Sequence, residues 1–288
     1  MDRTKIVACL SGLLLASCGG HPQIVVGSKN FTEQVILGEI LAQQIERRVG
    51  VPVERALNLG GTLLLHEALV RGSIDLYPEY TGTALMAVLK RPPATDPATV
   101  LADVRAAYRA QWKLAWLPPL GFNNTFAMIV RGETARGGHV ATLSDAAHAG
   151  PWHLGVGAEF QQRADGLPGL LKTYGLRLAG EPVTMDLGLL YSALDSRKVD
   201  MIAANSTDGP AAVRDVTILA DDRHYFPPYD CAVVVREETL ARYAGLRGVL
   251  EQLSGKLTAE TMRRLNREVD GERHPAAQVA RQFLDSLR

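Results

Sequence analysis

Short apolar runs alternate with amphipathic stretches along most of the chain. The first apolar runs are residues 23–26 and 53–57. Between them, residues 32–49 carry Ile36, Ile40 and other apolar side chains at helical spacing, with acidic and amide side chains on the opposite face. Strands that alternate with helices in this way predict an α/β fold.

The same alternation continues to the end of the sequence. Asp96 as a cap and Pro97 at the first helical position predict where one helix begins. Asp165 is predicted to cap the helix that follows its loop. Further strands are predicted at 74–76, 114–117, 127–130, 153–156, 182–185, 199–203, 216–219 and 231–235. Further helices are predicted at 62–71, from 81 to about 89, and at 98–111, 143–147, 167–174, 187–196, 237–243, 245–253, 259–269 and 275–287.

One segment of the chain is repeated. Residues 66–83 align without gaps on residues 191–208, and both copies read as a helix, a turn, a strand and a polar strand end. Tyr80 in the first copy corresponds to Asn205 in the second. A fainter similarity links residues 25–31 with 155–160. The repeat predicts two similar lobes that face each other, with a ligand between them.

Composition narrows the possible partners. The chain has 288 residues, of which 47% are hydrophobic, so about two domains can each bury a core. Lys and Arg number 31 and so do Asp and Glu, which leaves no net charge. Binding to nucleic acid phosphates needs a basic surplus, so the balance argues against a nucleic acid partner. It also argues against attraction to an anionic membrane by charge.

The first residues have the features of a targeting segment. Arg3 and Lys5 precede an apolar run, residues 6–16, that is shorter than the roughly 20 residues needed to span a bilayer. Residues 15–18 resemble the lipobox of bacterial lipoproteins, which implies a signal peptide at 1–17, a lipidated Cys18 and a tether at 18–22. The alternative is a plain secretory signal with an incidental cysteine. Cys231 then remains as the one cysteine inside the mature chain apart from the lipidated Cys18, and we predict a small buried hydrophobic residue without a disulfide.

Two strand ends carry candidate binding chemistry. Residues 76–83 place Tyr77, Tyr80 and Glu79 at a strand end, which suits the mouth of a ligand site, although aromatic residues also serve ordinary packing. Lys29 lies between a strand and a helix N-terminus, where open α/β sheets usually bind ligands and where anions are favoured. The alternative for Lys29 is a solvated surface lysine.

The sequence offers little support for an enzyme. The seven histidines are scattered without metal-ligand spacing, and no second cysteine is available in the mature chain for a zinc site. Ser206 and Asp208 lie close together, but no histidine is near them in the sequence to complete a triad. We therefore predict no catalytic residue, no metal and no cofactor.

The chain is predicted to leave its first lobe and return to it. Residues 122–126 precede a new strand and are the predicted first crossing, and residues 226–229 are the predicted return. We therefore expect residues 23–125 and 228–288 to form lobe 1 and residues 126–227 to form lobe 2. Two α/β lobes with a double-crossing hinge can close around a ligand.

Several blocks resemble one protein family. VVGSKNFTEQ, LYPEYTGT, FNNTF, RADG, NSTDG and FPPYDCAVVVR occur in order between residues 23 and 288 and resemble blocks of the osmoprotectant-type (glycine betaine, choline, carnitine) substrate-binding proteins of ABC importers. The resemblance implies the periplasmic binding protein type II fold and an extracytoplasmic, lipid-anchored monomer. It also implies ABC permease and ATPase subunits as partners.

The resemblance also implies a site. The ligand carboxylate is held by the residues that stand here as Lys29, Thr83 and Arg163, because two cations and a hydroxyl from facing lobes converge on it when the cleft shuts. Arg163 has an alternative role in the sequence itself, since it could pair with Asp165 or with solvent.

In the family, the ligand's quaternary ammonium group lies in a box of four tyrosines, where cation–π contacts are worth about 0.5–2 kcal/mol each. Tyr80 and Tyr229 match two of them, Phe126 replaces the third, and Asn205 stands at the fourth. Asn124 belongs to the FNNTF block beside Phe126 and is included in the predicted site.

The ligand is predicted to be glycine betaine or a related betaine. Asn205 offers a donor and an acceptor in place of a ring, which favours a larger trimethylammonium betaine with a polar group, such as ergothioneine, as the alternative. Choline ranks lower because it has no carboxylate for Lys29 and Arg163. A ligand-sensing protein that serves a membrane receptor would share the same fold and cleft.

Overall fold

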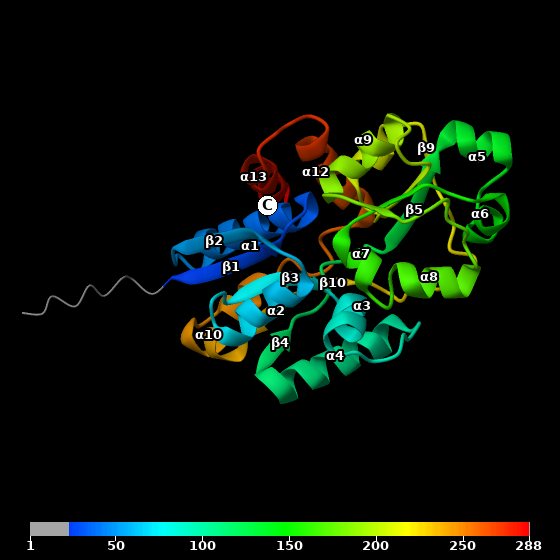
Figure 1. Cartoon of the computed structure of the whole chain (residues 1–288). Helices are drawn as coiled ribbons and strands as arrows, with labels where there is room; N and C mark the ends of the chain where they lie inside the picture. Colours follow the sequence, from blue (N-terminus) through cyan, green and yellow to red (C-terminus); the bar gives the residue numbers. More distant parts are fainter. Residues whose placement is uncertain (1–22, 288) are drawn as a thin grey trace, which may run out of the picture.

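The computed structural model describes residues 23–287, which form two lobes side by side, each built on a five-stranded mixed sheet (Figure 1). The strand orders are β2-β1-β3-β10-β4 and β7-β6-β8-β5-β9. We call the first sheet with its helices lobe 1 and the second sheet with its helices lobe 2. The predicted α/β fold with two lobes is confirmed.

Lobe 1 is a sheet covered by helices on both faces. Parallel pairing joins β1 to β2 and β3, and β10 runs antiparallel between β3 and β4. Its strands are β1 (Ile24–Lys29), β2 (Val53–Gly60), β3 (Leu76–Tyr80), β4 (Leu114–Trp116) and β10 (Cys231–Arg236). Alternate residues of β10 enter two separate cores, since Val233 packs under α1 while Val234 packs under α2 and α4.

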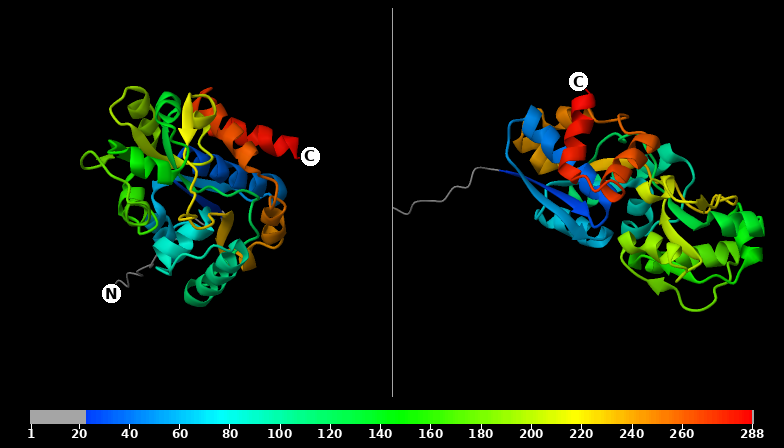
Figure 2. Two further views of the ribbon diagram at one scale, coloured as in Figure 1. Left: turned by 90° about the vertical axis from the view of Figure 1, so that its right-hand side faces the viewer. Right: turned by 90° about the horizontal axis from the view of Figure 1, so that it is seen from above.

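The helices of lobe 1 come from both ends of the chain. One face carries α1 (Thr32–Arg48), α11 (Leu246–Glu251), α12 (Ala259–Asp270) and α13 (Ala276–Ser286), so the C-terminal helices pack on the N-terminal one (Figure 2). The remaining helices are α2 (Thr62–Arg71), α3 (Thr81–Thr83), the π-helix η1 (Ala84–Val88), α4 (Pro97–Trp112) and α10 (Glu237–Arg242). Asp96 accepts a hydrogen bond from Thr99 N, which confirms the predicted cap of α4.

Lobe 2 is built from the middle of the chain. Its strands are β5 (Phe126–Arg131), β6 (Leu154–Val156), β7 (Val183–Thr184), β8 (Met201–Asn205) and β9 (Val216–Ile218). Its helices are α5 (Gly132–Gly138), α6 (Leu143–Ala149), α7 (Ala158–Gln162), α8 (Leu167–Tyr174), α9 (Leu190–Asp195) and the short 3-10 segments η2 (Leu187–Leu189) and η3 (Gly209–Ala212). The pattern of apolar residues did not predict α5 and α7, which are short and rich in polar residues or glycine.

The two sheets have the same topology. Each sheet has three neighbouring parallel strands, β2-β1-β3 in lobe 1 and β7-β6-β8 in lobe 2. The next strand in the sheet, β10 or β5, runs antiparallel to the third of them. The repeat seen in the sequence corresponds to this equivalence, because β3 and β8 fall at matching positions of residues 66–83 and 191–208. The predicted internal repeat is therefore a repeat of structure.

The chain crosses between the lobes twice. It leaves lobe 1 after β4 and returns through β10, and the two connections lie side by side, joined by a bridge between Asn123 and Asp230. Asn124 N donates to Tyr229 O at 3.1 Å in the same region. The two antiparallel connections agree with the double crossing expected from the sequence, and the residue limits of the lobes remain our prediction.

Candidate functional site

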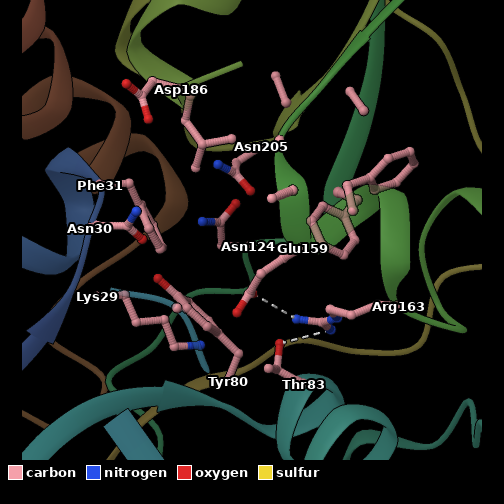
Figure 3. A pocket seen from close by; sticks show the side chains of 18 of the residues that line it. Lys29, Asn30, Phe31, Tyr80, Thr83, Asn124, Glu159, Arg163, Asp186 and Asn205 are labelled. Carbon is pink, nitrogen blue, oxygen red and sulfur yellow. Dashed lines mark hydrogen bonds and ion pairs between the residues drawn. The ribbon is translucent and has the colours of Figure 1, made fainter. Parts of the chain in front are cut away.

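A cavity of about 230 Å³ lies between the lobes, where strands of both sheets end (Figure 3). The structure brings every predicted ligand-binding residue to its wall: Lys29, Tyr80, Thr83, Asn124, Phe126, Arg163, Asn205 and Tyr229. Sequence reasoning missed other lining residues, among them Asn30, Phe31, Glu159, Phe160 and Asp186. Cys18 lies outside the described residues.

Lys29 has a carboxylate partner within the protein. It ends β1 and is only 3% exposed, and its Nζ lies 2.5 Å from Glu79 Oε1 on β3. The same ammonium group lies 5.1 Å from the centroid of the Tyr80 ring. A ligand carboxylate that reaches Lys29 must therefore share this cation with Glu79.

Arg163 connects the two lobes at the edge of the cavity. Its guanidinium group forms a two-pronged ion pair with Asp165, and its Nη2 donates to Thr83 Oγ1 at 3.2 Å. It also stacks over the Phe126 ring, 5.1 Å from the centroid. The predicted cap by Asp165 is wrong, because Gly166 occupies the cap position of α8 and the Asp165 carboxylate serves Arg163 and Tyr229 instead.

Glu159 closes the cleft from lobe 2. Its Oε1 accepts a hydrogen bond from Thr62 N at 2.5 Å, and its Oε2 accepts one from Thr62 Oγ1 at 3.1 Å, at the N-terminus of α2 in lobe 1. A side chain at Gly61 would collide with this carboxylate, so the glycine permits the close approach. Burial opposes ionisation of Glu159, but the charges of Lys29 and Arg163 hold its pKa below the ordinary value.

The signal that could have found Glu159 is the fainter similarity of residues 25–31 to 155–160. Gly157 and Glu159 in lobe 2 have the same spacing as Gly27 and Lys29 in lobe 1. Gly27 and Lys29 lie at the end of β1, and Gly157 and Glu159 come just after β6; both are inner strands of their sheets. The two strands thus bring a carboxylate and an ammonium group to one cavity.

Aromatic rings from both lobes form much of the wall. Phe31 stacks on Tyr80 with ring centroids 6.4 Å apart, and Phe126 meets Phe160 edge-on at 4.9 Å and Tyr229 at 5.8 Å. Tyr77, which the sequence grouped with Tyr80, points to the other face of β3 and packs in the core beneath α2 and α4. The wall is therefore suited to a cationic head group without hydrogen-bond donors.

Residues 22–286 match the family described as the substrate binding domain of ABC-type glycine betaine transport systems. The chain belongs to this family. Its members are substrate-binding proteins of ABC transporters rather than enzymes, and they work outside the cytoplasm, as the sequence predicted.

Individual relatives of the family differ in the ligand they are named for. A Helicobacter pylori ergothioneine transport permease and binding protein is 35% identical over 92% of this chain, which spans 47% of that protein, about half its length. A Pseudomonas aeruginosa glycine-betaine-binding protein is 34% identical, over 98% of this chain and 93% of its own length. A Listeria monocytogenes carnitine transport binding protein is 32% identical, with coverages of 97% and 94%.

A solved family structure supports the same fold. The crystal structure of a glycine betaine/carnitine/choline ABC transporter superposes with a TM-score of 0.76 at 32% identity, over 91% of this chain and 98% of that one. Within residues 23–287, no helix combines the length and apolarity needed to cross a membrane. The same residues contain no group of three His, Cys, Asp or Glu side chains placed to hold a metal ion. Cys231 is buried and free, as predicted.

Asn205, which we predicted to replace one tyrosine of the aromatic box, is held in place by Asp208. Its backbone N and its Nδ2 donate to the Asp208 carboxylate at 3.2 and 3.3 Å. Asp208 is half-buried, and burial raises its pKa to about 7 despite these hydrogen bonds. Asn205 and the exposed Asp186 form a polar end of the cavity, away from Lys29 and Thr83 (Figure 3).

Asp208 predicts a pH-dependent contribution to stability. Its pKa of about 7 in the folded protein lies above the ordinary value of 3.8, so its contribution is complete below about pH 4 and is lost as the pH rises through about 7. Thermal unfolding of the wild type and of Asp208→Asn should therefore differ, with a smaller fall in melting temperature between about pH 5 and pH 8 in the variant. Equal pH dependence of the two proteins would contradict this assignment.

Proposed function

We propose that this protein is the solute-binding component of an ABC importer and that it binds a trimethylammonium compound with a carboxylate tail between its lobes. The observation that carries the proposal is the composition of the cavity wall. Aromatic rings of both lobes surround the cavity, and the carboxylates next to it outnumber the cations. Lys29 and Arg163 are in contact with Glu79, Asp165 and Glu159. An environment of this kind favours a ligand with a positive, methylated head.

In this proposal the tail is bound by Arg163 and Thr83. Asp165 occupies one edge of the Arg163 guanidinium group, and Nη1 faces Glu159 at 3.5 Å, which is long for an ion-paired hydrogen bond. The ligand carboxylate takes the place of Glu159 beside Nη1 of Arg163. It then links Arg163 in lobe 2 with Thr83 in lobe 1. A ligand that contacts both lobes stabilises the closed state, because only that state provides all of its contacts.

The polar end of the cavity supports a ligand larger than glycine betaine. Asn205 and Asp186 offer hydrogen-bonding groups where another ring would complete a box for a small betaine. Sequence identities of 35, 34 and 32% to relatives named for ergothioneine, glycine betaine and carnitine do not separate these ligands. The polar end favours ergothioneine, whose ring carries N–H donors, over glycine betaine.

The cellular setting follows from the family and the N-terminal sequence. We propose that Cys18 carries the lipid anchor, that residues 18–22 tether the folded lobes to a membrane, and that the closed monomer docks on permease and ATPase subunits. Mass spectrometry of the membrane-extracted protein tests the anchor. A mature chain that begins at Cys18 and carries a diacylglyceryl mass is expected, and cleavage elsewhere would exclude lipidation.

A ligand screen tests the binding function directly. Melting of the purified protein is followed with glycine betaine, carnitine, ergothioneine and choline, since a ligand at 100 times its dissociation constant adds about 2.7 kcal/mol to the free energy of unfolding. We expect the carboxylated trimethylammonium compounds to raise the melting temperature, ergothioneine most and choline least. The proposed function fails if none of the four compounds stabilises the protein.

A further inference from the structure

Glu33 is a buried carboxylate directly behind the cavity wall. It lies in the first turn of α1 and is 2% exposed. Its Oε1 accepts hydrogen bonds from Tyr80 OH at 2.6 Å and Asn124 Nδ2 at 2.8 Å. Its Oε2 accepts them from Thr207 Oγ1 at 2.6 Å and Asn266 Nδ2 at 3.2 Å. These donors come from both lobes and from the first crossing between them.

The four donors around Glu33 favour its ionised form. Each oxygen receives two donors, and the orientation of the Asn266 amide is fixed because its Nδ2 also donates to Thr207 O at 2.8 Å. Burial is the largest influence and keeps the pKa of Glu33 above its ordinary value, although the hydrogen bonds from Thr207, Tyr80 and the two asparagines oppose that rise. Within residues 23–287, no Lys, Arg or His side chain forms an ion pair with it.

Two of the donors connect this charge to the ligand space. Tyr80 and Asn124 both line the cavity, and both donate to the same oxygen of Glu33. Asp165 has a similar link to Tyr229, whose OH donates to it at 2.7 Å, but Arg163 neutralises Asp165. Glu33 therefore differs from Asp165, Glu79 and Glu159, because each of these has a cation of the protein beside it.

We infer that Glu33 is a positioning residue that provides the fixed counter-charge for the cationic head of the ligand, acting through Tyr80 and Asn124. The inference rests on the proposed function. A phenol that donates to a carboxylate gains electron density on its ring, and cation–π attraction grows with the negative potential of the ring face. A buried carboxylate without a counter-ion also attracts any cation that enters the low-dielectric space beside it.

This role predicts discrimination between a cation and its neutral isostere. Tert-butylacetate has the shape and the carboxylate of glycine betaine, with a carbon atom in place of the quaternary nitrogen. If Glu33 acts by its charge, Glu33→Gln reduces the affinity for glycine betaine at least about tenfold more than the affinity for tert-butylacetate, since the loss is electrostatic. A residue that only holds the fold together would change both affinities equally.

Calorimetry with the two compounds tests the inference in the wild type, Glu33→Gln and Glu39→Gln. Glu39 is a matched control because it is also buried on α1, but it pairs with Arg55 away from the cavity. Its replacement should leave the ratio of the two affinities unchanged.

Tyr80→Phe provides a second variant if Glu33→Gln does not fold, because it keeps the ring and removes only the hydroxyl group that reaches Glu33. It should lower the same affinity ratio. Binding of glycine betaine with an unchanged ratio in the folded variants would overturn the role of Glu33 and leave the proposed function intact. A wild-type protein that binds neither these two compounds nor any compound of the ligand screen would overturn both.

Discussion

Replacement of Arg163 by alanine is expected to weaken the binding of a carboxylated trimethylammonium ligand at least about 100-fold, which corresponds to about 2.7 kcal/mol. Truncation of one partner in a buried, hydrogen-bonded charge pair costs about 2–5 kcal/mol. Here the loss removes the cation for the ligand tail, leaves Asp165 without a counter-charge and breaks the contact with Thr83 across the cleft. Isothermal titration calorimetry measures the effect.

Two comparisons give this experiment its control. Arg136→Ala removes an exposed arginine of lobe 2 that pairs with Asp215 at 2.7 Å, and it should leave affinity unchanged. Choline has the same head without the carboxylate, so Arg163→Ala should weaken its binding much less. Unchanged binding of the carboxylated ligand would exclude Arg163 from the site. Equal losses of affinity for both ligands would show that the variant impairs binding of the ammonium head group instead of the carboxylate tail.

Asn205→Tyr is expected to shift ligand preference by about 100-fold. A tyrosine adds a ring to the box, worth about 0.5–2 kcal/mol for a small quaternary ammonium, and it takes up part of the 230 Å³ cavity that a larger ligand needs. The affinity for glycine betaine should therefore rise about tenfold while that for ergothioneine falls about tenfold or more. Calorimetry of both ligands with the wild type and the variant gives the ratio.

Asn205→Leu separates the two causes of this shift. Leucine adds bulk without a π face, so it should weaken ergothioneine binding but give no gain for glycine betaine. A wild-type protein that already binds glycine betaine more tightly than ergothioneine would contradict the premise that Asn205, by leaving the aromatic box without a fourth ring, favours the larger ligand.

Strand ends explain why three residues of the site could be singled out from the pattern of the sequence, whereas Thr83, Asn124, Phe126, Arg163 and Tyr229 were predicted from the resemblance to the family. Lys29, Tyr80 and Asn205 each end a strand, and the apolar alternation locates those strands to within a few residues. The repeat then indicates that Tyr80 and Asn205 face a common space. Periodicity and repetition are local properties of the chain, so they can be read without knowledge of side-chain contacts.

The partners of the charged groups could not be read in the same way. Lys29 is 50 positions from Glu79, and Glu33 is 174 positions from Thr207. Glu159 lies in a short helix that the apolar pattern did not reveal, and its bond to Thr62 exists only because the two lobes meet. Such contacts depend on how the lobes close, and no spacing in the sequence encodes that.

The shared topology of the two sheets gives the cavity matching corners with opposite chemistry. Tyr80 ends β3 where Asn205 ends β8, and Lys29 at the end of β1 has Glu159, just after β6, as its counterpart. A solute with two different ends therefore has one favourable direction in which to lie. A molecule with identical quaternary groups at both ends would find suitable contacts at only one end of the cavity. A ligand with two chemically different ends is therefore expected to bind better.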